Sequence, residues 1–384
     1  MSVGAPGCFI DAWRRRKSRA FDLERNSTAR RTVDVDLWSV RRRVYANANL
    51  SIYSGQPCEG SCPFCVEKVR PASRGLELAA QKAVETHEDR YFAALGEVLR
   101  AVRPLDPSVS LTGGEPSTDP KLPRILRTLA AHGVRKRTLT TNGSGLLEAR
   151  EGRLVVDWIG ATGVKHLNIS RALPGDDANA ELMGLPCQLS ADELRYAVAR
   201  ARDAGSRVRL SCVLIEGGIS NLQGILEYLE FARSLGVDNV VFRQLMLTDP
   251  RTHHDGPVMR ASDRMRVQLE PLLDDVSADP SFMFERQVLG YYYYVEVWRH
   301  AGVDVVFEEA DLAQLERVKQ ESPGVVHELV FHPNAHLAST WQAWDGVLGP
   351  APTDECFVAN RSSGEEVPRA AAARPLGVLA RPCE

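Results

Sequence analysis

The sequence contains no long apolar run and no excess of charge of one sign. No stretch reaches the roughly eighteen consecutive apolar residues that a membrane-spanning helix needs, and residues 1–16 lack the apolar core of a signal peptide. The formal net charge of −3 over 384 residues gives no electrostatic reason to expect nucleic acid as a partner. With 44% apolar and 25% charged residues, the composition favours a globular protein with a sizeable core, expected in the cytoplasm.

Cysteine is scarce and unevenly placed. The chain has eight cysteines, and Cys58, Cys62 and Cys65 follow one another in C-x3-C-x2-C order with no fourth nearby. Structural zinc sites and most iron–sulfur clusters use four closed ligands, so a trio favours a metal centre with one open coordination position. The alternative is a zinc site with a distant fourth ligand. This distribution fits a metal in a reducing compartment better than disulfides.

Strand-like and helical patterns alternate along most of the chain. Apolar, β-branched runs at 46–53, 108–112, 136–141, 164–170, 207–215 and 239–246 are separated by helical patterns. This order predicts right-handed βαβ units and a parallel sheet. Later segments are expected as a helix (262–276), strands (282–309), a helix (311–319) and a strand (325–337). The expected divisions are an Arg-rich, solvated flank (1–45), a core (46–250), a C-terminal extension (251–356) and a weakly ordered tail (357–384).

Polar residues occupy every second position of the expected strands. Side chains of a strand alternate between its two faces, so each polar set lies on one face. The interior of a full eight-stranded barrel is filled by apolar residues, whereas this pattern predicts an open, polar lumen suited to a polar ligand. The sets are Asn47/Asn49/Ser51, Ser110/Thr112, Thr138/Thr140/Asn142, His166/Asn168/Ser170, Arg209/Ser211 and Arg243.

The cysteine trio and a second motif together resemble the radical S-adenosylmethionine (SAM) enzymes. The second motif is the Gly113-Gly114-Glu115-Pro116 turn that ends the next expected strand. The resemblance covers roughly residues 45–250 and implies an α/β fold, a partial (βα)6 barrel with a C-terminal α+β extension. It also implies a [4Fe–4S] cluster held by three cysteines, with SAM chelating the fourth iron. Reductive cleavage of SAM then gives a 5′-deoxyadenosyl radical that abstracts hydrogen from the substrate. An electron donor such as flavodoxin or ferredoxin is an implied partner.

The resemblance also assigns residues to the cofactors. Cys58, Cys62 and Cys65 become the cluster ligands. The remaining SAM contacts that it implies are Phe64 near the adenine, Gly113, Gly114 and Glu115 at the methionine moiety, Thr140, Asn142 and Asn168 at strand ends, Ser170 at the ribose, Arg171 at the carboxylate, and Ile215 and Gln244 at the adenine. Each has an ordinary structural alternative: loop packing for Phe64, a surface salt bridge for Arg171 and core packing for Ile215 and Gln244.

The C-terminal third carries weaker signals. The barrel most resembles the molybdenum-cofactor-cyclase branch, but only Cys356 and Cys383 follow Cys212, too few for that branch's auxiliary cluster, so its activity is not carried over. Arg243 and Cys356 are the catalytic candidates, with Cys356 or Tyr293 as a hydrogen-atom donor. The spacing of His332 and His336 resembles a metal motif, although the intervening proline argues against it.

The sequence therefore predicts a radical SAM enzyme acting on a polar small molecule such as a sugar, nucleoside or amino acid. A first alternative is a peptide-modifying radical SAM maturase, which would often hold more than about four irons per chain. A second is a non-catalytic iron–sulfur or zinc scaffold, which would not bind SAM. No sequence motif identifies the substrate.

Overall fold

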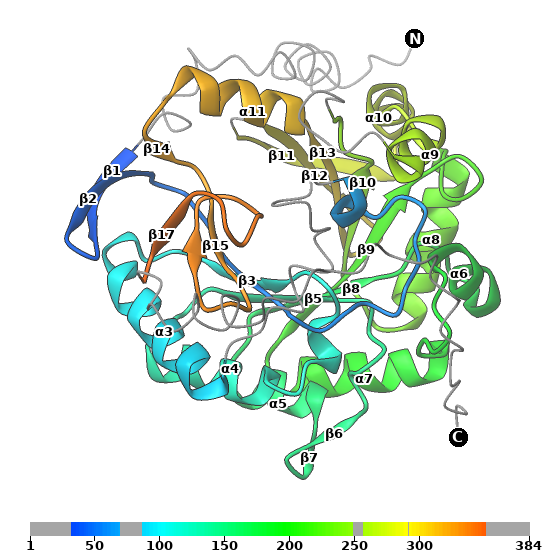
Figure 1. The fold of residues 1–384 in the computed structure, drawn as a ribbon. Coiled ribbons are helices and arrows are strands. Elements are labelled where there is room, and N and C mark those ends of the chain that lie inside the picture. Colours follow the sequence, from blue (N-terminus) through cyan, green and yellow to red (C-terminus); the bar gives the residue numbers. More distant parts are fainter. Residues whose placement is uncertain (1–31, 70–86, 249–255, 291, 351–384) are drawn as a thin grey trace, which may run out of the picture.

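A computed structural model of the chain describes residues 32–69, 87–248, 256–290 and 292–350. Its centre is a strongly curved sheet of twelve strands with helices along its outer side (Figure 1). In the described ranges there is no helix with the length and apolar content needed to cross a membrane.

Six parallel strands form the middle of the sheet and correspond to the six predicted runs. They are neighbours in the order β3-β4-β5-β8-β9-β10. Their bounds are β3 (Leu50–Tyr53), β4 (Val109–Thr112), β5 (Arg137–Thr141), β8 (His166–Ser170), β9 (Arg207–Leu214) and β10 (Asn239–Gln244). Helices on the outer side connect them: α3 (Glu88–Ala101), α4 (Leu122–Ala131), α5 (Val155–Ala161), α7 (Ala191–Asp203) and α8 (Leu222–Ser234) (Figure 1). The partial (βα)6 barrel is confirmed.

Strands of the C-terminal segment extend both edges of this barrel. At one edge β13 (Val303–Ala310) pairs in parallel with β10, followed by the antiparallel β12 (Tyr293–His300) and β11 (Phe282–Leu289). At the other edge β15 (Leu329–Phe331) pairs in parallel with β3 and leads to β16 (Leu337–Ala338) and β17 (Val347–Gly349). With α11 (Leu312–Glu321), this is the predicted α+β extension.

Shorter elements complete the described chain. They are α6 (Asp176–Met183), the hairpin of β6 (Ala149–Arg150) and β7 (Arg153–Leu154), and the 3-10 turns η1 (Val66–Val69), η2 (Arg103–Leu105) and η3 (Pro116–Thr118).

The helix predicted over 262–276 is instead two helices. These are α9 (Pro257–Met265) and α10 (Leu269–Ala278). Between them Arg266 has extended backbone and donates hydrogen bonds to the carbonyls of Leu245 (3.0 Å) and Met246 (2.9 Å). The break therefore ties this segment to the chain just beyond β10.

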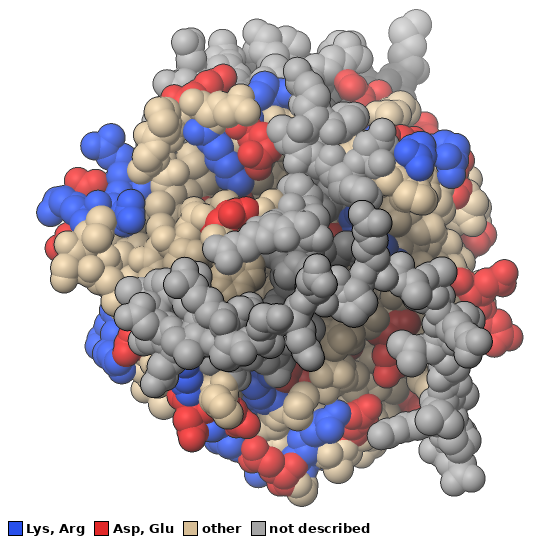
Figure 2. All heavy atoms as spheres, viewed as in Figure 1, with Lys and Arg blue, Asp and Glu red and all other residues tan. Residues whose placement is uncertain are grey.

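The prediction of a solvated flank is wrong for residues 32–45. This part forms an antiparallel hairpin of β1 (Thr32–Leu37) and β2 (Val40–Tyr45), and β2 also pairs with β14 (Val325–Val326). Leu37 and Val44 are fully buried. Basic side chains lie over this hairpin, while acidic and basic groups are interspersed elsewhere on the visible face (Figure 2). Residues 1–31 and the predicted tail 357–384 lie outside the described residues.

The predicted alternation of polar and apolar positions is present in the barrel strands. Ser51, Ser110, Thr138 and His166 face one another across four neighbouring strands. The positions between them are Ile52, Leu111, Leu139 and Leu167, each at most 2% exposed and part of the main core cluster. The apolar core therefore lies on the helix side of the sheet, and the polar set faces the lumen.

Candidate active site

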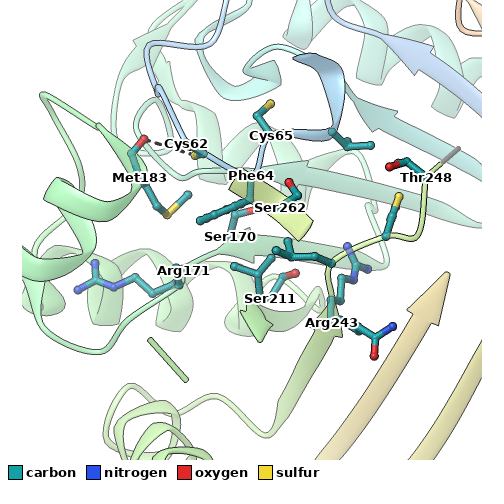
Figure 3. Close-up of a pocket in the computed structure, with 16 residues that line it drawn as sticks. Cys62, Phe64, Cys65, Ser170, Arg171, Met183, Ser211, Arg243, Thr248 and Ser262 are labelled. Carbon is teal, nitrogen blue, oxygen red and sulfur yellow. Dashed lines mark hydrogen bonds between the residues drawn. The ribbon is translucent and has the colours of Figure 1, made fainter. Parts of the chain in front are cut away.

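A cavity of about 250 Å³ lies where the cysteine loop meets the carboxyl ends of three barrel strands. Such strand ends are the usual ligand-binding edge of parallel α/β folds. The residues that line it are Cys62, Phe64, Cys65, Val66, Ser170, Arg171, Ala172, Met183, Ser211, Val213, Arg243, Gln244, Leu245, Met246, Thr248 and Ser262 (Figure 3).

The cysteine loop is anchored by the end of α6. The carbonyl of Met183 accepts hydrogen bonds from the Ser61 amide (3.0 Å) and from the Cys62 thiol (3.4 Å). The next residue, Gly184, has φ +58°, and a Cβ there would lie 1.9 Å from the Ser61 Oγ. Only glycine fits this left-handed position so close to another segment. This contact fixes Cys62 beside the cavity.

The environment of the three thiols disfavours their charged form when no metal is bound. Cys58, Cys62 and Cys65 are all free thiols. Burial raises the pKa of Cys62 to about 12, with the neighbouring Cys65 and Cys58 adding to the shift, and burial also raises the pKa of Cys58 and of Cys65. Three adjacent thiolates therefore need a cationic partner to be stable.

The donor set fits an iron–sulfur cluster with an open iron. Three soft sulfur ligands sit on one loop, and two of them line a cavity large enough for part of a small molecule. Within the described residues no three His, Cys, Asp or Glu side chains already converge on a point that could hold a metal.

The glycine turn after β4 packs tightly against the start of the cysteine loop. Gly113 has φ +79° and a Cβ there would lie 2.0 Å from the Tyr53 ring; at Gly114, with φ +54°, it would lie 1.9 Å from the carbonyl oxygen of Gln56. The Gly114 amide donates to Glu67 Oε1 at 2.9 Å. Both glycines are thus required by the backbone itself, and the turn joins β4 to the segment that carries the cysteines.

Glu115 does not have the ligand-facing role predicted for its side chain. It is 1% exposed. Its Oε1 accepts hydrogen bonds from the Ser117 amide (2.8 Å), the Ser117 hydroxyl (2.7 Å) and the Thr141 hydroxyl, and its Oε2 accepts one from the Asn142 amide (2.7 Å). Burial raises the pKa of this carboxyl, and the four hydrogen bonds oppose the shift. Glu115 joins the ends of β4 and β5.

Arg171 likewise points away from the cavity that its backbone borders (Figure 3). The guanidinium donates to the carbonyls of Leu173 (2.9 Å), Leu189 (3.2 Å) and Pro174 (2.8 Å), and it pairs with Asp176. At 3% exposure it has little surface left for a ligand. The predicted contact with a SAM carboxylate is not supported, because these bonds fix the guanidinium in a structural network.

Four other predicted residues meet at the cavity from distant parts of the chain. Phe64, Ser170, Arg243 and Gln244 all line it. Gln244 is 5% exposed, and its Oε1 accepts the Leu269 amide at 2.7 Å, so it is held by the start of α10.

The remaining predicted residues that the structure describes lie outside the cavity lining. Ile215 is fully buried, as its core-packing alternative predicts. Asn142 borders the cysteine loop, with its amide nitrogen 3.7 Å from Cys58 Sγ. Asn168 donates to Thr140 at 3.4 Å. Cys356 lies outside the described residues.

The sequence interpretation missed several lining residues. Met183, Val213, Thr248 and Ser262 belong to no motif, and only Val213 had a signal, since it shares a strand face with Ser211.

The two C-terminal histidines that resembled a metal motif are structural. His332 and His336 are 1% and 3% exposed. His332 Nε2 lies 3.1 Å from the carbonyl of Thr340, and His336 Nδ1 lies 3.3 Å from the Asn334 amide nitrogen. They hold the turn between β15 and β16.

Comparison with known proteins finds relatives among cyclases. The chain is 27% identical over 215 residues to the GTP 3′,8-cyclase of Marinobacter nauticus, covering 54% of this chain and 57% of that protein. It is 26% identical over 219 residues to GTP 3′,8-cyclase 1 of Mycobacterium tuberculosis, covering 55% and 54%. The chain thus spans about half the length of the curated relatives it matches. No family model matches it.

Partial matches among solved structures include two complexes with SAM. Streptococcus suis SuiB bound to S-adenosylmethionine has a TM-score of 0.38 and 18% identity, covering 53% of this chain and 40% of that one. The enzyme anSMEcpe with bound AdoMet has a TM-score of 0.37 and 12% identity, covering 51% and 50%. The cysteine motif, the barrel and these relatives are together similar to those of the radical SAM superfamily.

Proposed function

We propose that this protein is an enzyme that cleaves SAM reductively at a [4Fe–4S] cluster and abstracts hydrogen from a polar small molecule. Cys58, Cys62 and Cys65 would hold the cluster. With SAM bound, such a cluster would supply a 5′-deoxyadenosyl radical, with methionine as the other product, and the substrate would lie beside the cavity. A small electron-transfer protein such as flavodoxin or ferredoxin would reduce the cluster, in the cytoplasm.

One observation carries the proposal: the cavity joins the cysteine loop to residues more than a hundred positions away. Cys62 and Cys65 line it together with Ser170 and Gln244. A zinc scaffold needs no cavity beside its thiols, whereas a cofactor that binds the cluster and extends away from it does.

The lining residues have separate roles in this proposal. Phe64 offers an aromatic face for the adenine, Ser170 a hydroxyl for the ribose, and Gln244 lies on the strand that borders the adenine. Their surroundings are mainly apolar, with Ala172, Met183, Val213 and Leu245 in the same wall. Such a wall excludes water from a reactive intermediate.

The substrate is proposed as a small polar molecule because the lumen below the cavity is lined by hydrogen-bonding side chains. The relatives named as GTP 3′,8-cyclases act on a nucleotide, which belongs to this class. Because the chain matches about half of each relative, the substrate is proposed here only as a class.

Cofactor content tests the proposal. Wild type, Cys62→Ala and Cys212→Ala are reconstituted anaerobically with iron and sulfide, and iron and SAM binding are measured by elemental analysis and equilibrium dialysis. Cys212 is a matched control because it is a free, fully buried thiol on β9, outside the trio. About four irons per chain and SAM binding are expected in wild type and Cys212→Ala, with both reduced in Cys62→Ala. Zinc without SAM binding in wild type would support the scaffold instead.

A further inference from the structure

Two arginines lie on the lumen face of the barrel, at and below the cavity. Ser211 lines the cavity, so Arg209, two residues earlier on β9, projects from the same face of the strand. Arg243 lines the cavity from β10. Asn168 lies opposite Arg209 on β8, and Glu308 lies opposite Arg243 on β13. We call these four residues the lower lumen.

Positive charge exceeds negative charge in the lower lumen. Arg209 donates from Nε to the side chain of Asn239, and no carboxylate in the described chain lies within ion-pair distance of it. Arg243 Nη2 is 3.4 Å from Glu308 Oε2, and its Nε is buried without a hydrogen-bond partner. Of the two guanidinium groups, only that of Arg243 therefore has a carboxylate partner among the described residues.

Nearby charged groups do not correct this imbalance. Asp304 is already paired with Arg207 and with Arg299, the latter at 2.8 Å. Burial lowers the pKa of Arg209, and the positive charge of Arg243 lowers it further, with Glu308 opposing. His166, on the same face of β8, has its pKa lowered by burial and by Arg209 and Arg207, so it remains neutral near pH 7. The arginines alone carry the positive charge.

A partly buried guanidinium whose N–H groups lack acceptors raises the free energy of the folded protein unless an anion accepts those hydrogen bonds. Guanidinium groups present donors in a planar fork that matches a carboxylate or a phosphate. Asn168 adds a buried amide oxygen without a partner, which can accept a hydrogen bond from a ligand hydroxyl or amine. The lower lumen therefore offers an anion site with a polar neighbour.

We propose that Arg209 and Arg243 bind an anionic group, carboxylate or phosphate, of the substrate. The inference rests on the proposed function, because it places the rest of the substrate between this anion and the SAM cavity. It narrows the substrate class to small anions and makes Arg243 a substrate-binding residue.

Titration with simple anions tests the proposal on the reconstituted enzyme. Inorganic pyrophosphate and malonate serve as probes for phosphate and carboxylate, titrated calorimetrically at low ionic strength in the presence of SAM. The proteins are wild type, Arg209→Gln, Arg243→Gln and Arg195→Gln. Arg195 is the control because it is an exposed arginine on α7 paired with Asp192. At least one probe is expected to bind wild type and the control equally, and about tenfold more weakly to each lumen variant.

A second readout uses wild type alone, in case a variant fails to fold. Phenylglyoxal modification mapped by mass spectrometry should be slowed at Arg209 and Arg243 by the bound probe and unchanged at Arg195. The proposal is overturned if neither probe binds a wild-type sample that binds SAM, or if the probes give no protection. A sample that does not bind SAM contradicts the proposed function instead, so the two failures are distinguishable.

Discussion

Replacing Glu115 with glutamine tests whether this residue serves the fold or the cofactor. The carboxylate is 1% exposed and accepts four hydrogen bonds, three on Oε1 and one on Oε2. Glutamine has the same shape but only one acceptor oxygen. If its oxygen keeps the bonds of Oε1, its NH2 group replaces Oε2 and faces the Asn142 amide, which is also a donor.

The loss can be estimated from these contacts. The variant loses one charge-assisted hydrogen bond and leaves two buried donors facing each other. We expect the free energy of unfolding of the apo protein to fall by about 2–4 kcal/mol, because leaving buried polar groups unsatisfied costs about 1–3 kcal/mol each. Urea titration of apo wild type and Glu115→Gln, followed by circular dichroism, measures this difference.

An exposed acid provides the control. Glu148→Gln removes a carboxylate that is about half exposed and pairs with Arg150, so we expect a change below about 1 kcal/mol. If apo Glu115→Gln is as stable as wild type while its SAM affinity falls, the structural role described here is incorrect, and the contact with the methionine moiety of SAM that the sequence predicted would replace it.

Three further perturbations follow from the structure. Gly114→Ala should destabilise the apo protein more than Gly133→Ala, since both have positive φ but only the first places its Cβ against backbone, 1.9 Å from the Gln56 carbonyl oxygen; equal urea midpoints would refute this. Arg171→Gln should lower the unfolding free energy by about 2–4 kcal/mol by unpairing buried carbonyls, and an unchanged value would contradict the network. The pKa of His166 is lowered by burial, so the unfolded state takes up its proton first as the pH falls below about 6.5. The contribution of neutral His166 to the free energy of unfolding is therefore present above that pH and decreases toward pH 5.5. His166→Gln should flatten the fall in Tm between pH 7.5 and 5.5. An identical pH profile of Tm in wild type and variant would show that His166 does not contribute.

The sequence was most informative where one residue type has few structural uses. The spacing of the cysteine trio predicted the loop beside the cavity, and the alternation of apolar runs with helices predicted all six barrel strands. Both signals are local, because the cysteine spacing and the pattern of each single strand are contained within a few neighbouring residues. The polar alternation also predicted the face that carries Ser170, Ser211 and Arg243.

The failures concern partners that come from elsewhere in the chain. Glu115 and Arg171 stand at strand ends, where charged side chains often meet a ligand. Which donors and carbonyls surround them depends on distant segments such as Asn142 and Leu189, and a single sequence does not reveal that convergence. The structure shows protein partners for both side chains where the sequence predicted a ligand.

The hairpin of β1 and β2 was missed for a different reason. Its many charges indicated a solvated segment, yet Val35 and Leu37 alternate with aspartates and are both nearly fully buried. This alternation of apolar and charged residues is a strand signal, but the number of charged residues was given more weight in the prediction. The turn between the strands uses Trp38 and Ser39 at positive φ, without the glycine or asparagine that normally marks such a turn.

The most direct test of the proposed function is SAM cleavage. Anaerobically reconstituted wild type, Cys62→Ala and Cys212→Ala are reduced with dithionite in the presence of SAM, and 5′-deoxyadenosine is measured by liquid chromatography and mass spectrometry. We predict 5′-deoxyadenosine together with methionine from wild type and Cys212→Ala, and none above background from Cys62→Ala. Equal release from all three proteins, or none from a wild type that holds about four irons and binds SAM, would contradict the proposed reaction.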